Sequence, residues 1–336
     1  MVTVHDVARA AGVSISTVSR ALASPERVAA ETRERVTRIA AELGYRPNQA
    51  ASGLRIGRTH AVGLLVPDLE NPYFATVTKA VQARARAEGY EVFVADSDED
   101  PEVEAELIGA LASRTDGLIV ASPRSAEAEL HAALAGVTAV LANRELSAEP
   151  GSATPAVPSV CVDDADGAAQ VLGHLYALGH RTVGIAAGPT SSWSGARRVA
   201  GLTAATGRWD VELVQLGVFQ PYFAGGTQAA DYALASGVSA VVAFNDLMAL
   251  GVLDRLRQRG VDVPGDLSVV GFDDVQVATL VSPALTTVRA PLARLGRRAV
   301  DLLLTRLRGG TATGVQLPVE LTIRGSSGPA PAGTVS

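Results

Sequence analysis

Residue types that carry catalytic or metal chemistry are scarce in this chain. It has one cysteine, Cys161, which excludes an internal disulfide and suggests a reducing compartment. Its five histidines are scattered, and no base stands near the cysteine in the sequence. The acidic segment 96–100 lacks the glycine and the distal glutamate of a calcium loop. We therefore expect no enzyme, no cofactor and no metal site.

Long apolar runs and leader-like segments are also missing. No apolar run approaches the length that spans a bilayer, although 47% of the residues are hydrophobic. The N-terminus begins with a polar helical pattern rather than with a signal peptide. Segment 66–70, after the first strand-like run, has no glycine that could bind a dinucleotide phosphate. We expect a cytoplasmic protein without a membrane partner, and not an oxidoreductase.

Lysine is nearly absent, so arginine carries the positive charge, and it does so unevenly. The whole chain has a net charge of −6. Residues 1–60 hold nine arginines against five acids, a formal charge of +4, which leaves −10 for the remainder. A basic segment can meet nucleic-acid phosphates while an acidic remainder keeps the protein in solution. The length of 336 residues predicts two or three domains.

What the N-terminus does contain is a helix-turn-helix pattern. Thr3 can cap a first helix, with Asp6 in the acidic place of a capping box. Gly12 gives the turn its backbone freedom, and Ser14 can cap a second helix. The outward-facing residues of that helix are expected to be Ile15, Ser16, Ser19 and Arg20. Such a helix can enter a DNA major groove, where an arginine can bind guanine with two hydrogen bonds.

A third amphipathic helix over 29–43 strengthens this interpretation. Residues 6–20, 31–36 and 43–54 read D-V-A-x-x-A-G-V-S-x-x-T-V-S-R, E-T-R-x-R-V and L-G-Y-x-P-N-x-x-A-x-x-L. In this combination the chain resembles the lactose-repressor (LacI–GalR) family of bacterial transcription regulators. The match continues, element by element, to about residue 327.

The resemblance implies a homodimer that binds a palindromic double-stranded DNA operator. Residues 47–58 would form a hinge helix and linker, in which Leu54 wedges into the minor groove and Arg55 neutralises phosphate. The DNA-binding residues implied are Thr3, Ser14, Ile15, Ser16, Thr17, Ser19, Arg20, Asn48, Ala51, Leu54 and Arg55.

From residue 59 onward, apolar strand-like runs alternate with amphipathic helical stretches. This alternation is typical of parallel sheets covered on both faces by helices. The fold expected is an all-α helix-turn-helix head joined by a hinge helix to a two-lobed α/β body. That body would resemble periplasmic binding proteins, with two parallel, doubly wound sheets. The family resemblance implies that the chain crosses between the lobes three times.

The domain boundaries expected are as follows. Residues 1–46 form the head and 47–58 the hinge; 59–158 with about 288–316 form the N-terminal lobe; 159–287 with about 317–326 form the C-terminal lobe; and 327–336 form a disordered tail. The tail has no heptads, so a tetramer built on a C-terminal coiled coil is not expected.

Polar residues gather after the predicted strands, where ligands of parallel sheets bind. The resemblance implies that Arg198, Asn245 and Asp273 hold ligand hydroxyls, and that Phe219 stacks on the ligand ring. Trp193 is a second stacking wall or an ordinary packing residue between the lobes. The effector-binding residues predicted are Asp68, Tyr73, Phe74, Asn143, Trp193, Arg198, Phe219, Asn245 and Asp273. Each of the polar ones could instead be a helix cap or loop residue.

Three departures from the family pattern bear on the effector. Asn143 stands where many relatives have aspartate, the segment 201–209 is several residues short, and Ser192 takes a position that is basic in some nucleobase- and ribose-binding relatives. We expect a sugar-like effector, with a nucleoside or nucleobase as the alternative. A sugar-binding transport protein is the competing class, but it needs no arginine-rich helical head. The sequence does not separate a repressor from an activator.

Overall fold

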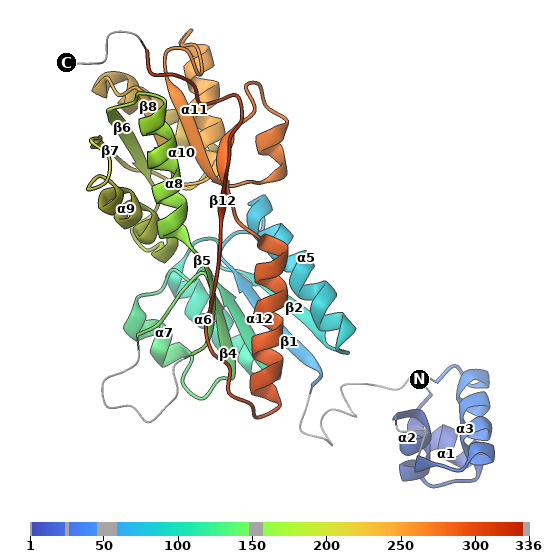
Figure 1. The fold of residues 1–336 in the computed structure, drawn as a ribbon. Helices are drawn as coiled ribbons and strands as arrows, with labels where there is room; N and C mark the ends of the chain where they lie inside the picture. Colours follow the sequence, from blue (N-terminus) through green and yellow to red (C-terminus); the bar gives the residue numbers. More distant parts are fainter. Residues whose placement is uncertain (1, 24–26, 46–58, 148–156, 332–336) are drawn as a thin grey trace. The chain divides into compact units, whose positions relative to one another are not determined.

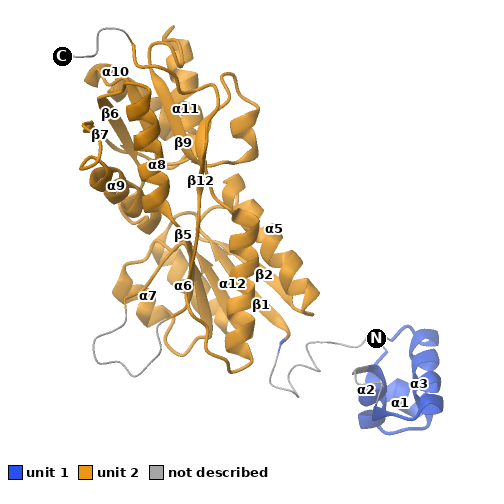
Figure 2. Cartoon of the chain, in the orientation of Figure 1, with its two compact units in different colours: residues 1–59 blue, residues 60–336 orange. Residues whose placement is uncertain are grey.

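The computed structural model describes residues 2–23, 27–45, 59–147 and 157–331. The chain forms two compact units, residues 1–59 and residues 60–336 (Figure 2). The predicted hinge, 47–58, lies outside the described residues, and so do the DNA contacts predicted at Asn48, Ala51, Leu54 and Arg55. Those predictions remain untested.

The first unit is built from three helices. They are α1 (Val4–Ala11), α2 (Ile15–Ala23) and α3 (Ala30–Glu42). The capping box expected at α1 is present, since the backbone N–H of Thr3 donates to the Asp6 carboxylate at 2.9 Å. Gly12 ends α1 in the left-handed conformation, with φ at 63°. The predicted helix–turn–helix is therefore confirmed, and its core is centred on the buried Val7, Val18 and Val36.

The second unit has two lobes, each with a six-stranded sheet between helices (Figure 1). The first lobe contains β1 (Ala61–Val66), α5 (Pro72–Ala87), β2 (Glu91–Asp96), α6 (Pro101–Ala112), β3 (Gly117–Ala121), α7 (Glu127–Ala133), β4 (Ala139–Ala142), β5 (Ser159–Val162), α12 (Leu292–Leu307) and β11 (Val315–Leu317). Its strand order is β11-β5-β4-β3-β1-β2, and the pairs are parallel. Strand β1 is buried at every position, as expected for a parallel strand covered on both faces.

The second lobe repeats this plan. It contains α8 (Asp164–Ala177), β6 (Thr182–Ala187), α9 (Trp193–Ala205), β7 (Glu212–Val218), α10 (Phe223–Ser236), β8 (Ala240–Ala243), α11 (Asp246–Gln258), β9 (Ser268–Asp273), the 3₁₀ helix η2 (Gln276–Thr279), β10 (Thr286–Arg289) and β12 (Glu320–Thr322). The strand order is β12-β10-β9-β8-β6-β7, parallel except for the antiparallel pairing of β10 with β12. One core lies under α8 and α9 and another under α10 and α11, so helices cover both faces.

The chain crosses between the lobes three times, as the resemblance implied. It leaves the first sheet after β5, returns after β10, and leaves again between β11 and β12 (Figure 1). The predicted boundary before residue 159 is wrong, because β5 pairs with β4 and β11 in the first sheet. Strand β10 likewise keeps 288–289 in the second lobe. The first crossing therefore falls after Val162.

The C-terminal segment also differs from the prediction. Residues 327–331 were expected to be disordered, but they lie along the second lobe. The backbone N–H of Ala330 donates to the Leu178 carbonyl at 2.8 Å, and that of Gly328 donates to Ser268 Oγ at 3.0 Å. The buried His180 holds the same segment, with its Nε2 at 3.0 Å from the Gly328 carbonyl oxygen. Backbone hydrogen bonds thus order a stretch whose composition suggested a free tail.

Candidate functional site: a helix face and an inter-lobe pocket

The outer face of α2 is the first candidate site. Ser14 caps this helix, as predicted, by accepting the Thr17 backbone N–H at 3.2 Å. Ser16 and Arg20 are exposed one turn apart, and Arg20 Nε donates to the Ser16 carbonyl at 3.2 Å. No acidic residue lies on α2. The helix therefore presents a serine and an arginine side by side on its exposed surface.

The other head residues predicted to bind DNA are less prominent. Ile15 is only half-exposed because it packs against the core of the head, which differs from the outward position expected. Thr17 and Ser19 are also half-buried. Thr3 is exposed, with its hydroxyl bonded to Asp6 at 2.7 Å. The exposed polar surface of α2 thus narrows to Ser16 and Arg20.

The second candidate site is a polar pocket between the lobes, which we call the cleft pocket. From the first lobe it is lined by Asn71, Tyr73, Phe74, Glu99, Ser122, Arg124 and Asn143, and from the second by Ser192, Ser194, Arg198, Pro221, Phe244, Asn245 and Asp273. Its volume is about 30 Å³, roughly the space of one water molecule. A sugar-sized ligand can enter only if the lobes or side chains move apart.

Arg198 is the centre of the second-lobe side of this pocket. Its Nε donates to Asp164 Oδ1 at 2.7 Å, and its Nη2 to Asp273 Oδ1 at 3.2 Å. Its Nη1 donates to the Phe244 carbonyl oxygen at 2.6 Å. All three guanidinium nitrogens are therefore engaged, and the side chain is fixed where α9 meets the strand ends of the sheet.

The acids around Arg198 are buried, and burial changes their protonation. It raises the pKa of Asp273 to about 7, although the charge of Arg198 opposes this shift. Burial also raises the pKa of Asp164 and of Asp246. Asp246 accepts the Val275 backbone N–H at 2.9 Å, so it holds the chain just beyond β9. Two buried carboxylates thus face a single arginine, and a third lies close behind them.

The first-lobe side contains the aromatic residues and a second ion pair. Asn143 Nδ2 donates to Tyr73 Oη, and the Tyr73 and Phe74 rings meet edge to face at 5.0 Å. Asn143 has a positive φ of 54°, which asparagine tolerates better than most residues. Arg124 forms a two-point pair with Glu99, at 2.5 and 2.8 Å. This pair closes the first-lobe wall of the pocket.

Two asparagines of the cleft pocket are also helix caps. Asn71 caps α5 by accepting the Tyr73 backbone N–H at 3.0 Å. Asn245 caps α11 through the Met248 backbone N–H at 2.8 Å, and its Nδ2 donates to the Pro221 carbonyl at 2.9 Å. Asn245 is therefore both a helix cap and a lining residue of the cleft pocket.

The structure brings together six of the nine predicted effector residues. These are Tyr73, Phe74, Asn143, Arg198, Asn245 and Asp273. Asp68 is buried at the end of β1 but does not line the pocket, and it accepts the Glu70 backbone N–H at 2.7 Å. Trp193 is half-buried beside the guanidinium of Arg197, at 5.5 Å from it.

Phe219 lies at a neighbouring hollow, which we call the cleft mouth. The mouth has a volume of about 410 Å³ and is lined by Glu99, Pro189, Val218, Phe219, Gln220 and Gln228. The Phe219 ring packs edge to face on Tyr232 at 5.6 Å. Because Glu99 lines both hollows, the mouth adjoins the cleft pocket.

Sequence reasoning missed three charged residues that form the ion pairs of this site. Arg124 follows β3 at its carboxyl end, so the rule that located Asn143 could have found it. Glu99 lies in the acidic segment 96–100, which was considered from the sequence only as a calcium loop. Asp164 is the first residue of α8. Acidic residues are common there because they interact favourably with the helix dipole, so the sequence gives no separate sign that Asp164 forms an ion pair.

Two further observations describe the molecule within the resolved ranges 2–23, 27–45, 59–147 and 157–331. No group of three or more metal-ligating side chains is found there. No helix in those ranges is long and apolar enough to cross a membrane.

The chain is similar to known proteins over both units. Residues 3–48 match the bacterial regulatory proteins of the lacI family, and residues 172–327 match the periplasmic binding protein-like domain. The HTH-type transcriptional regulator DegA of Bacillus subtilis (strain 168) is 30% identical over 335 residues, covering 97% of this chain and 98% of that protein.

Two solved structures have the same architecture. The lac repressor dimer bound to operator and the anti-inducer ONPF has a TM-score of 0.86 and 30% identity, covering 97% of this chain and 99% of that one. The transcriptional regulator CelR in complex with cellobiose has a TM-score of 0.71 and 30% identity, covering 97% and 100%. With its helix-turn-helix unit, its two-lobed body and relatives that match along nearly all of its length, the chain belongs to the lacI family of bacterial transcription regulators.

Proposed function

We propose that this protein is a cytoplasmic, homodimeric repressor that binds a palindromic operator and releases it when a small sugar-like molecule enters between the lobes. The observation that carries the proposal is the cleft pocket, where both lobes supply side chains that can form hydrogen bonds with hydroxyl groups. The body that contains this pocket follows a helix-turn-helix unit in the chain. The relatives support it, since one is a repressor dimer on its operator and another holds cellobiose.

The DNA-binding role falls on α2. Arg20 is exposed and suited to a two-point contact with guanine, with Ser16 beside it. Thr3, Ser14, Ile15, Thr17 and Ser19 remain the other proposed contacts of the head, and the hinge residues Asn48, Ala51, Leu54 and Arg55 complete the proposed set. One guanine contact is worth about 1–3 kcal/mol of base discrimination.

The effector-binding role falls on groups that pair well with hydroxyls. Asp273 and Asn245 can accept or share hydrogen bonds, and Arg198 can donate them. The rings of Tyr73, Phe74 and Phe244 offer apolar faces to the C–H side of a sugar. The mouth, with Gln220 and Gln228, has room that the inner pocket lacks.

The closed state of the cleft pocket gives a physical basis for the switch. With room for about one water, the pocket binds a sugar only in a more open arrangement. A ligand that binds one arrangement better than another shifts the population toward it. We propose that this opening separates the hinge segments (residues 47–58) of the two protomers and weakens the dimer's hold on DNA.

The test begins with an operator selected from a random duplex DNA pool by the full-length protein. Binding is followed by fluorescence anisotropy while pentoses, hexoses, cellobiose and nucleosides are titrated. We expect one sugar class to release the DNA from wild type but not from Asp273→Ala. If only nucleosides release the DNA, the effector is a nucleoside and not a sugar. If Asp273→Ala responds fully, the cleft pocket is not the effector site.

A matched pair of arginine variants tests the DNA-binding surface. Arg20→Ala should weaken operator binding by about 5- to 150-fold, as expected for loss of about 1–3 kcal/mol. Arg257→Ala is the control, because this exposed arginine of α11 pairs with Asp254 in the body. Equal operator affinity of the two variants would exclude α2 as the reading helix.

A further inference from the structure

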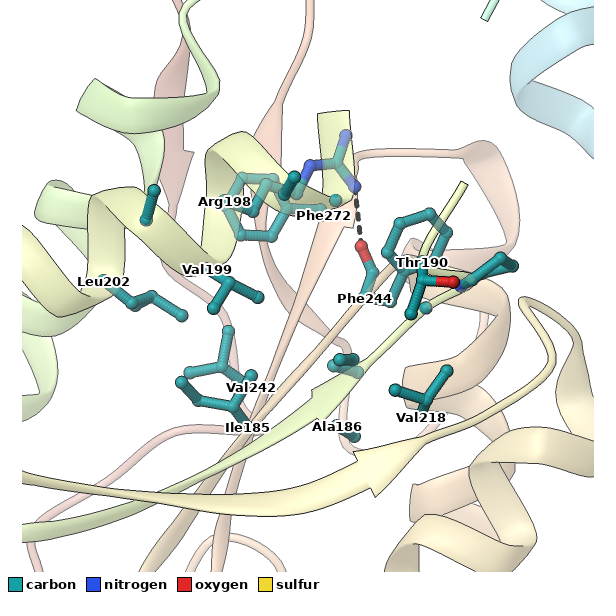
Figure 3. Close-up of a pocket in the computed structure, with 17 residues that line it drawn as sticks. Ile185, Ala186, Thr190, Arg198, Val199, Leu202, Val218, Val242, Phe244 and Phe272 are labelled. Atoms are coloured by element: carbon teal, nitrogen blue, oxygen red, sulfur yellow. Dashed lines mark hydrogen bonds between the residues drawn. The ribbon is translucent and has the colours of Figure 1, made fainter. Parts of the chain in front are cut away.

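The second lobe contains a large hollow besides the cleft pocket and the mouth. It lies between α9 and the carboxyl ends of β6, β7, β8 and β9, and we call it the α9 pocket (Figure 3). It is lined by Ile185, Ala186, Ala187, Gly188, Pro189, Thr190, Gly195, Ala196, Arg198, Val199, Ala200, Leu202, Val218, Val242, Ala243, Phe244 and Phe272. Its volume is about 390 Å³, within the usual size range of small-molecule sites.

The lining of the α9 pocket is almost entirely apolar. Of the 17 lining side chains, only those of Thr190 and Arg198 contain nitrogen or oxygen. Seven of the 17 residues are alanine or glycine, so the space exists because large side chains are missing from its walls. An apolar cavity of about 150 Å³ already accepts benzene. The α9 pocket therefore suits a compact apolar group rather than a sugar.

The α9 pocket shares two residues with the cleft pocket. Arg198 and Phe244 line both, and the Arg198 guanidinium is bonded to the Phe244 carbonyl between them (Figure 3). The Phe244 ring lies against Gly188, where a Cβ atom would come within 2.4 Å of the ring. A group bound in the α9 pocket thus touches two of the seven residues that line the second-lobe side of the cleft pocket.

We propose that the α9 pocket binds a compact apolar group, the size of an aromatic ring or a branched alkyl group. Its lining supplies dispersion contacts and removes apolar surface from water. The group can be a free apolar molecule or a substituent carried by the cleft ligand, because the α9 pocket and the mouth share Pro189 and Val218. The proposal concerns the body alone and does not depend on DNA binding.

The test uses 4-fluorotoluene as the probe and the full chain as the receptor. Ligand-observed ¹⁹F NMR should report saturable line broadening with wild-type protein, and unlabelled toluene should reverse it. Absence of saturable binding to wild type overturns the proposal.

Three variants on one helix locate the probe. Ala196→Phe and Ala200→Phe fill the pocket from exposed positions on α9, so neither disturbs a buried core. Ala204→Phe is the control, because Ala204 is exposed on the same helix but does not line the pocket. We expect at least a tenfold loss of probe affinity in the first two and wild-type binding in the third. Wild-type binding in all three variants overturns the assignment.

A competition arm separates the two sources of the apolar group. Phenyl glycosides and the matching methyl glycosides are added to the bound probe. If phenyl glycosides displace the probe and methyl glycosides do not, the pocket binds a substituent of the cleft ligand. If toluene displaces the probe and neither glycoside does, the pocket binds a separate molecule. Sugar release of the operator without probe binding would overturn this inference and leave the proposed function intact. Probe binding by a protein that binds no operator would support this inference and overturn the proposed function.

Discussion

The cleft pocket has an ion pair on each side, and the two sides balance their charges differently. On the first lobe, Arg124 and Glu99 form a one-to-one pair. On the second lobe, Arg198 faces both Asp164 and Asp273, whose side chains are 2% and 7% exposed. In the first pair one acid meets one arginine, whereas on the second side two buried acids share a single arginine. A proton or a ligand donor is therefore best accommodated on the second-lobe side.

The largest expected difference comes from removing each arginine. Arg198→Ala leaves two buried carboxylates without their cation, and breaking such a pair costs about 3–5 kcal/mol. Arg124→Ala leaves only Glu99, whose side chain is 13% exposed and can turn toward water, so we expect about 1–3 kcal/mol. Urea unfolding, followed by fluorescence of the two tryptophans of the second lobe, measures both.

The circular dichroism spectrum of each variant serves as the control for folding. Equal losses of unfolding free energy would contradict the difference in charge balance. A smaller loss in Arg198→Ala at pH 5 than at pH 8 would strengthen the comparison, because the uncompensated acids can then take up protons.

A smaller effect is expected from pH alone. Burial raises the pKa of Asp273 to about 7, against about 3.9 for an unfolded aspartate. Between these values the folded protein holds a proton that the unfolded chain has released. The stabilisation is complete below the lower value and is lost as pH rises through 7, with a slope of up to about 1.4 kcal/mol per pH unit.

Comparison with Asp273→Asn isolates this contribution. Asp164 and Asp246 also have raised pKa values, and both remain in the variant. The unfolding free energy of wild type should therefore fall more steeply than that of Asp273→Asn between pH 5 and pH 7. If the unfolding free energies of wild type and Asp273→Asn change in parallel with pH, the titrating group is not Asp273.

The part of the site that could be predicted is the part that follows visible strands. Asn143, Asn245 and Asp273 each come at the end of a continuous apolar run, so local pattern put them at the ligand edge of a sheet, and the resemblance added roles for Asn245 and Asp273. Arg198 came instead from the family resemblance, since nothing local marks an arginine on α9 as a pocket residue. Asp164 reaches it only through tertiary packing, at 2.7 Å across 34 residues.

The failures of prediction in the fold have the same cause. Strand β5 is a short strand of four residues, Ser-Val-Cys-Val, and no local signal says that it pairs with β11, some 150 residues later. Residues 327–331 have a composition typical of disorder, yet their order comes from hydrogen bonds to distant partners such as Leu178 and Ser268. Local pattern predicts elements well, but long-range pairing decides which lobe receives them.

The two capping asparagines allow a finer comparison of the two sides. Loss of an N-cap costs about 1 kcal/mol, so Asn71→Ala should destabilise the body by that amount. Asn245→Ala should cost about 1–2 kcal/mol, because the bond to the Pro221 carbonyl is lost as well. Urea midpoints of the two variants give the measurement, and equal midpoints would contradict the added role of the second bond.

Serine at position 245 separates stability from ligand binding. Asn245→Ser keeps a capping oxygen and should recover most of the stability lost in the alanine variant. If the operator response to sugar is lost in Asn245→Ser while stability is recovered, the side chain also binds the effector. A normal response would leave Asn245 as a cap alone.

The smallest expected effect lies on the first-lobe side, in the bond between Asn143 and Tyr73. Tyr73→Phe leaves the Asn143 amide without its acceptor, and we expect a loss of about 1 kcal/mol. Asn143 Oδ1 already has no hydrogen-bond partner among the described residues, so the amide has little else to hold it. Removing both partners in Tyr73→Phe/Asn143→Ala should cost less than the sum of the single changes. Strict additivity in this double-mutant cycle would mean that the bond contributes nothing, and the first-lobe side would then be held by the Arg124–Glu99 pair and by ring packing.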